Sequence, residues 1–111
     1  MNLRNIENTA ELDTLLQETE TPVVVDFWAP WCGPCRALGP ILEDTAAELG
    51  EEAVFVKVNV DENAELARSH RITSIPTLLY FSNGEVKNRH TGVAPKEAII
   101  EKVGRISAQT V

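Results

Sequence analysis

The motif VVVDFWAPWCGPC occupies residues 23–35 and carries most of the information about the fold of this chain. Residues 23–28 are apolar on both faces except at Asp26, which is typical of a central strand covered on each side. Two cysteines separated by two residues follow this strand. Beyond them, apolar side chains recur at helical spacing and predict a long helix that is kinked at Pro40 and ends at Gly50.

The segments around this motif predict further helices and strands. Asn8 is expected to cap a first helix, with Glu11 three residues later. Residues 53–60 predict a second buried strand, and the order of strand, helix and strand indicates a right-handed parallel crossover. A short helix is predicted through residues 64–67.

A hairpin and a last helix complete the predicted fold. Asn83 and Gly84 lie between β-rich runs at residues 77–81 and 85–91, which is a strong hairpin signal, and Pro95 is expected to start the final helix. We therefore predict an α/β fold, a mixed sheet with helices on both faces. The cysteines would lie at the C-terminal end of a central strand, where open α/β folds place their active sites.

Length, composition and charge limit the possible functions. A chain of 111 residues fits one domain over residues 1–111, and its 43% hydrophobic and 24% charged residues are typical of a globular protein. Seventeen acidic against ten basic residues give a net charge of −7, which disfavours nucleic acid and anionic membranes as partners. The chain starts without an apolar signal region and has no run long enough to span a bilayer, so we expect a cytoplasmic protein.

The cysteine pair indicates redox or metal chemistry rather than a structural disulfide. A bridge across two intervening residues closes a very small loop and adds little stability. His70 and His90 lie far from the cysteines in the sequence, and their spacing fits no zinc finger. We therefore expect no metal site and two solvated surface histidines.

Cysteines at the start of a helix suit thiol–disulfide exchange. A thiol attacks a disulfide only as an exposed thiolate, and the unpaired N–H groups and positive dipole end of a helix N-terminus stabilise that anion. Cys32 is therefore the predicted nucleophile, and Cys35, one turn into the helix, would resolve the mixed disulfide. Pro34 removes one N–H donor, so the thiolate is less stabilised and the pair is expected to act as a reductant.

Asp26 is the one charged residue in an otherwise apolar strand. Burial without a paired cation would raise its pKa and allow it to accept the Cys35 proton during resolution. The pattern is equally compatible with a structural carboxylate satisfied by backbone N–H groups. Lys57 likewise interrupts an apolar run, and by itself it is most simply a lysine that extends from a strand end.

Three segments of this chain resemble thioredoxins. They are VDFWAPWCGPC at residues 25–35, IPT at 75–77 and FSNGE at 81–85, and the similarity extends over the whole chain. The resemblance implies a thioredoxin fold, in which a central mixed five-stranded sheet is flanked by about four helices. It also implies a monomer without a cofactor that reduces disulfides of cytosolic proteins and is re-reduced by an NADPH-dependent thioredoxin reductase.

The resemblance further implies roles for individual residues. It favours the catalytic interpretation of Asp26 and places Lys57 beside it, where a positive charge would limit the rise in the carboxyl pKa. It implies a cis peptide bond before Pro76 that faces the cysteines and leaves the Ile75 backbone free to pair with an extended substrate strand. A flat apolar docking surface is expected from Trp31, Gly33, Pro34, Ile75, Pro76, Gly92 and Val93.

Two other functions are compatible with the same residues. The fold could serve as a rigid binding subunit in which the cysteines are incidental. The pair could also act as an oxidant or isomerase, which requires a much less negative reduction potential. Serine substitution of both cysteines distinguishes the binding subunit from a reductase, and a glutathione redox titration distinguishes the oxidant.

Overall fold

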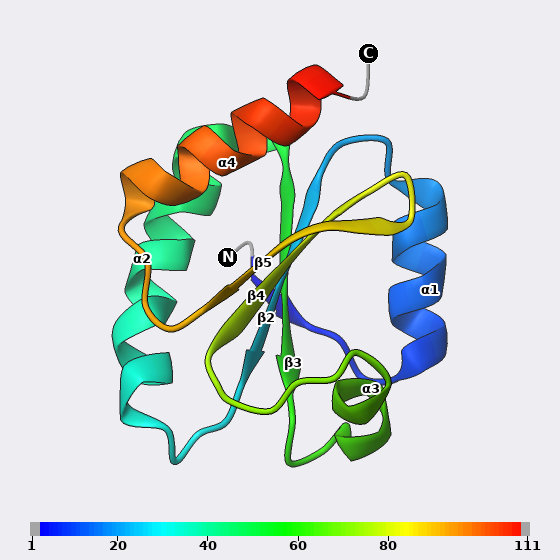
Figure 1. Ribbon diagram of the computed structural model, residues 1–111, viewed down its shortest axis with the longest axis vertical. Helices are drawn as coiled ribbons and strands as arrows, with labels where there is room; N and C mark the ends of the chain where they lie inside the picture. Colours follow the sequence, from blue (N-terminus) through cyan, green and yellow to red (C-terminus); the bar gives the residue numbers. More distant parts are fainter. Residues whose placement is uncertain (1–2, 110–111) are drawn as a thin grey trace.

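A five-stranded mixed sheet forms the centre of the computed structural model, which describes residues 3–109 (Figure 1). Its strands lie in the order β1 (Arg4–Asn5), β3 (Val54–Asn59), β2 (Val23–Trp28), β4 (Thr77–Ser82) and β5 (Glu85–Thr91). β3 runs parallel to β1 and β2, whereas β4 is antiparallel to β2 and β5. The predicted α/β class, the mixed sheet and the central position of β2 are confirmed.

Helices cover both faces of this sheet. In Figure 1, α2 (Gly33–Leu49) lies to its left and α4 (Lys96–Gln109) runs across the upper left and top, whereas α1 (Thr9–Glu18) and α3 (Ala64–Ser69) lie to its right. A short 3-10 helix, η1 (Gly50–Glu52), follows α2. Within residues 3–109, no helix is both long enough and apolar enough to cross a membrane.

Alternating strand residues fill one hydrophobic core on each face of the sheet, because successive side chains of a strand point in opposite directions. The core between the sheet and the α2 and α4 helices includes Val24, Leu38, Leu42, Leu78, Tyr80, Ile99 and Val103. The core on the α1 and α3 side includes Leu12, Val23, Val25, Phe27, Val56, Leu66, Leu79 and Phe81. β2 supplies both cores, which explains its continuous apolar sequence.

The helix ends carry the predicted caps. The side chain of Asn8 accepts a hydrogen bond from the Glu11 backbone N–H at 2.9 Å, and the Glu11 carboxylate accepts one from the Glu7 N–H at 2.7 Å. α2 passes through Pro40 and is followed by Gly50, whose φ of 57° suits glycine. The boundaries of α2 are therefore those that the sequence predicts.

The hairpin between β4 and β5 turns at the predicted Asn-Gly pair. Asn83 has a φ of 54° and Gly84 a φ of 78°. Positive φ at both central residues is the type I′ geometry, which matches the twist of the two strands. β4 continues to Ser82, one residue beyond the predicted strand.

Other differences from the predicted elements are short. β1 and η1 are not predicted from the residue pattern, because two or three exposed polar residues carry no periodicity. α3 continues to Ser69, two residues past the predicted segment. Pro95 lies just before α4 rather than in it, and its carbonyl accepts hydrogen bonds from the Ala98 and Ile99 N–H groups.

Candidate active site

The two cysteines form a disulfide at the point where β2 leads into α2. Cys32 is the N-cap residue of α2, and its Sγ lies 3.1 Å from the backbone N of Cys35, whose N–H points toward it. This N–H belongs to the first turn of the helix and has no acceptor within it. The geometry therefore provides a donor to the Cys32 sulfur and aligns that sulfur with the positive end of the helix dipole.

The Cys32 sulfur is less accessible than the sequence-based expectation of an exposed thiol. In this disulfide-bonded form Cys32 is 5% exposed and Cys35 is 3% exposed. The Cys32 Sγ lies 3.9 Å from the carbonyl oxygen of Ile75, and Ile75 packs against the cysteine pair. The loop that carries Ile75 therefore covers the sulfur in part, and the two cysteines differ by position on the helix more than by exposure.

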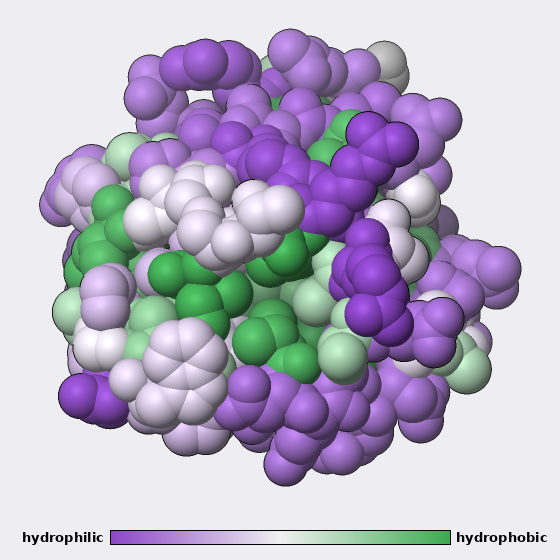
Figure 2. Space-filling view, turned by 60° about the horizontal axis from the view of Figure 1, so that its bottom comes forward, coloured by the Kyte–Doolittle hydropathy of each residue, from purple (hydrophilic) through white to green (hydrophobic). Residues whose placement is uncertain are grey.

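An apolar surface surrounds the disulfide. Figure 2 shows hydrophobic side chains gathered in a hollow on the end of the molecule where α2 begins, with hydrophilic residues around them. Trp31 is 67% exposed and Val93 is 42% exposed, although large apolar side chains are usually buried. Gly33 and Pro34 are also exposed, and Ile75 and Gly92 are half-buried.

Pro76 differs from the expectation that it forms part of the exposed docking surface. It is buried, and its carbonyl accepts a hydrogen bond from the Gly92 N–H at 2.8 Å. The peptide bond between Ile75 and Pro76 is cis, as expected. Pro76 therefore lies beneath the surface that Ile75 and Val93 present.

A groove of about 410 Å³ lies between Trp31, which precedes Cys32, and the segment from α3 to Ile75. The residues that line it are Trp31, Val60, Ala67, Ile72, Thr73, Ser74 and Ile75. Only Trp31 and Ile75 among these are predicted from the sequence. The other residues come from separate elements, and a lone apolar residue after a helix end, such as Ile72, is the only local signal for them.

Hydrogen bonds fix Trp31 and the loop that precedes α2. The Trp31 Nε1–H donates to the Asp61 carboxylate at 2.9 Å, which orients the exposed indole. The Arg36 guanidinium donates to the Pro30 carbonyl at 3.0 Å and so links the first turn of α2 to the loop before it. Neither Asp61 nor Arg36 is predicted as a site residue, because nothing in the sequence pairs them with these partners.

Asp26 is buried in β2, on the sheet face that packs against α2. It is 1% exposed, and neither carboxylate oxygen has a hydrogen-bond partner within residues 3–109. Burial raises the pKa of Asp26 from its ordinary value of 3.8 to about 7, while the positive charge of Lys57 acts in the opposite direction. A structural carboxylate satisfied by backbone N–H groups is therefore not what the structure contains.

Lys57 lies beside Asp26, as the resemblance implies. The two residues pair across β2 and β3, and the Lys57 ammonium lies 3.9 Å from the centroid of the Trp28 ring. This cation–π contact holds the ammonium over an apolar surface instead of placing it in a hydrogen bond with the carboxylate. The carboxylate therefore has a charged neighbour but keeps a raised pKa.

The prediction of two solvated histidines is wrong for His70. Its ring lies 6.0 Å from the Phe27 centroid and 5.8 Å from the Phe81 centroid, so it packs on the sheet. Burial and the nearby Arg89 lower the pKa of His70, and Asp13 opposes them. Within residues 3–109, no group of three or more His, Cys, Asp or Glu side chains is placed to hold a metal ion.

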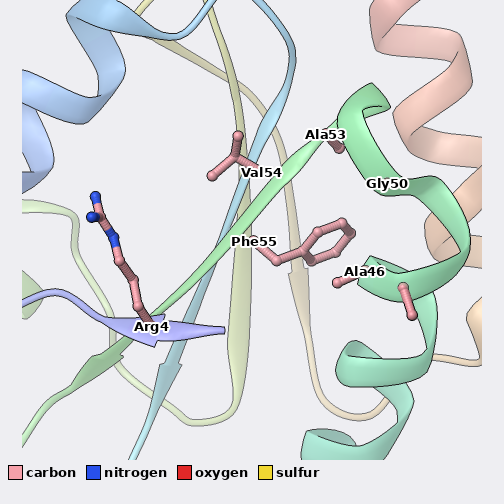
Figure 3. Close-up of a pocket in the computed structure, with 7 residues that line it drawn as sticks. Arg4, Ala46, Gly50, Ala53, Val54 and Phe55 are labelled. Atoms are coloured by element: carbon pink, nitrogen blue, oxygen red, sulfur yellow. The ribbon is translucent and has the colours of Figure 1, made fainter. Parts of the chain in front are cut away.

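Another cavity, of about 470 Å³, lies where α2 ends and β3 begins (Figure 3). Arg4, Ala46, Ala47, Gly50, Ala53, Val54 and Phe55 line it. The lining contains one cation, no carboxylate and no nucleophile. This cavity therefore offers no side chain that could act as a nucleophile or as a general acid or base.

The sequence of this chain is similar to known thioredoxins. The family model for thioredoxin matches residues 4–105. The thioredoxin of Bacillus subtilis is 46% identical over 89 residues, which cover 80% of this chain and 86% of that protein. The chloroplastic M-type thioredoxin of Pisum sativum is 46% identical over 98 residues, which are 88% of this chain but only 57% of the length of the pea protein.

Solved structures resemble the fold over nearly the whole chain. Chloroplastic thioredoxin z superposes with a TM-score of 0.88 at 33% identity, covering 97% of this chain and 96% of that one. Fasciola hepatica thioredoxin superposes with a TM-score of 0.86 at 36% identity, covering 93% and 98%. The arrangement of the sheet and helices is therefore one that known thioredoxin structures share.

Proposed function

This chain belongs to the thioredoxin family and is a thiol–disulfide oxidoreductase, and we propose that it acts as a reductant for disulfides in cytosolic proteins. One observation carries the exchange activity, and the missing N–H donor of Pro34 supports its direction toward reduction of the substrate. Cys32 is the N-cap of a 17-residue helix, and the Cys35 N–H points at its sulfur. A thiolate at this position is stabilised before any substrate arrives.

The exchange consists of two displacements. The Cys32 thiolate attacks one sulfur of a substrate disulfide, so the substrate bond breaks, a mixed disulfide forms and the first substrate thiolate leaves. Cys35 then attacks the Cys32 sulfur, which releases the second substrate thiolate and forms the Cys32–Cys35 disulfide. Two electrons pass to the substrate, and the short spacing makes the second displacement effectively intramolecular.

Asp26 and Lys57 act in the second displacement in this proposal. Cys35 must lose its proton before it attacks, and a carboxyl group with a pKa of about 7 can accept that proton near neutral pH. Lys57, held over Trp28, keeps the pKa of Asp26 from rising further. The burial of Asp26 and its place on the face toward α2 support this role.

Substrate proteins dock on the apolar surface around the disulfide in this proposal. Trp31, Gly33, Pro34, Ile75, Gly92 and Val93 form it, and Pro76 supports it from below. The carbonyl of Ile75 lies 3.9 Å from the Cys32 sulfur, so an extended segment that paired with this backbone would bring its disulfide to Cys32. A surface that binds a substrate through its backbone and through apolar contacts does not depend on particular side chains, so it suits many substrates.

The proposal also covers the oligomeric state, the reductase partner and the cellular location of the protein. The chain acts as a single domain and a monomer, and a thioredoxin reductase that uses NADPH restores the dithiol. A cytosolic location suits a reductant, because thiols are kept reduced there. The pea relative is chloroplastic, so fractionation of cells that express the full chain is the appropriate check.

The direction of electron flow tests this proposal. In an equilibrium titration against glutathione, we expect a reduction potential of about −270 mV, which is the value typical of thioredoxins. Pro34 at the start of α2 removes one donor that would otherwise favour the reduced form. A potential of about −120 mV, typical of strong oxidants, would overturn the proposal.

A further inference from the structure

Arg89 of β5 makes two hydrogen bonds to the end of α3. Its Nη2 donates to the His70 carbonyl at 2.6 Å, and its Nη1 donates to the Arg71 carbonyl at 3.4 Å. Carbonyls at a helix C-terminus have no partner within the helix, so a side chain from another element satisfies them here. The planar guanidinium suits this task, because it presents two parallel N–H groups in a fixed geometry.

The backbone that Arg89 holds makes a sharp change of direction. Arg71 has a φ of 58°, a conformation that is uncommon for a residue other than glycine and that the surroundings must maintain. The His70 ring packs between Phe27 and Phe81 of the sheet. The turn is therefore fixed on one side by His70 and on the other by Arg89.

This turn leads directly into residues 72–75, which we call the docking loop. These residues form one side of the groove, and the Ile75 carbonyl lies 3.9 Å from the Cys32 sulfur. Just after the loop, the Gly92 N–H that follows β5 donates to the Pro76 carbonyl at 2.8 Å. Hydrogen bonds therefore hold the docking loop at both ends. Arg89 of β5 holds the residues just before the loop, and Gly92, the residue after β5, holds Pro76 just after it.

We propose that Arg89 is a positioning residue that fixes the docking loop in the geometry that substrates recognise beside Cys32. It acts through the carbonyls of His70 and Arg71, and it touches neither cysteine. The proposal rests on the proposed function, since it assigns the cause of substrate affinity at the same site. It separates substrate docking, which Arg89 controls, from sulfur reactivity, which the start of α2 controls.

The test compares Arg89→Met and Arg89→Lys with Lys87→Met. Lys87 lies on the same strand and pairs with Glu85, so its replacement removes the same charge away from the docking loop. With NADPH and thioredoxin reductase, we expect Arg89→Met to raise the KM for insulin about three- to tenfold with kcat within about twofold. The single-turnover reduction of a small aromatic disulfide, 5,5′-dithiobis(2-nitrobenzoic acid), is expected to keep its wild-type rate.

Arg89→Lys keeps the charge but not the fork of two N–H groups, so its KM is expected between the wild-type and Arg89→Met values. A wild-type KM for insulin in Arg89→Met would overturn the proposal. An equal KM rise in Lys87→Met, or full recovery in Arg89→Lys, would also overturn it, because charge alone would then explain the effect. A parallel fall in the small-disulfide rate would assign Arg89 to the cysteines instead.

Amide hydrogen exchange provides a readout that needs no substrate. The Ile72 N–H donates to the Ala67 carbonyl at 3.0 Å, and we expect it to exchange about tenfold faster in Arg89→Met, while amides in the middle of β2 keep their rates. Unchanged exchange at Ile72 would contradict the proposal. If the wild-type protein failed to reduce insulin, the proposed function would fail, and the exchange at Ile72 would still decide the role of Arg89.

Discussion

Replacing Cys32 by serine is expected to lower the rate of insulin reduction by about a thousandfold or more. A serine hydroxyl at the N-cap of α2 can still accept the Cys35 N–H, so the fold is expected to persist. It is not ionised near neutral pH and cannot form a disulfide, so the first displacement is lost. The measurement is the turnover of insulin disulfides with NADPH and thioredoxin reductase.

Cys35→Ser is the matched control for this result. It retains the nucleophile and removes only the resolving thiol, so we expect it to accumulate a mixed disulfide with a substrate protein, visible as an adduct that dithiothreitol releases. Turnover by Cys32→Ser at the wild-type rate would contradict the assigned nucleophile. Full biological function of the variant with both serines would instead favour a binding subunit whose cysteines are incidental.

Replacing Asp26 by asparagine is expected to stabilise the protein at pH 8 by up to about 4 kcal/mol. Burial raises the pKa of Asp26 from 3.8 to about 7, and a difference of this size between the folded and unfolded states corresponds to that free energy. Above pH 7 the folded protein must carry an ionised carboxylate that is 1% exposed and lacks a hydrogen-bond partner among residues 3–109. Asparagine removes this charge with little change in volume.

The sign of the pH dependence follows from the direction of the shift. Between pH 4 and pH 7 the folded state holds a proton on Asp26 that the unfolded state has released. The contribution of Asp26 to stability is therefore fully present below pH 4, is lost as the pH rises to about 7, and is constant above it. Urea unfolding of the oxidised proteins between pH 4 and pH 8 measures this, and wild-type and Asp26→Asn curves that run parallel would contradict it.

The sequence predicts the centre of the fold better than its edges. β2 is recognised because Val23 to Trp28 supply both hydrophobic cores, and the hairpin because Asn83 and Gly84 adopt positive φ. β1 is missed because Arg4 and Asn5 are exposed and become a strand only by pairing with β3. Two polar residues show no sequence pattern that would indicate pairing with a distant segment.

The sequence likewise predicts some residues of the candidate site and not others. Cys32 and Asp26 stand out in the sequence because one is a cysteine at a helix start and the other an acid in an apolar strand, whereas Trp31 is identified through the resemblance. The groove residues, such as Val60, and the positioning residue Arg89 are ordinary where they occur in the sequence. Their roles arise only because β5, α3 and the loop before β4 meet beside the disulfide.

The reactivity of Cys32 as a function of pH tests the central claim most directly. In reduced Cys35→Ser protein, the rate of alkylation of Cys32 by iodoacetamide is measured from pH 5 to pH 9, with free cysteine as the reference. If the start of α2 stabilises the thiolate, the rate at pH 6.5 is expected to remain within about tenfold of its plateau. A rate that falls in parallel with that of free cysteine, by about tenfold for each pH unit below 8, would contradict the account.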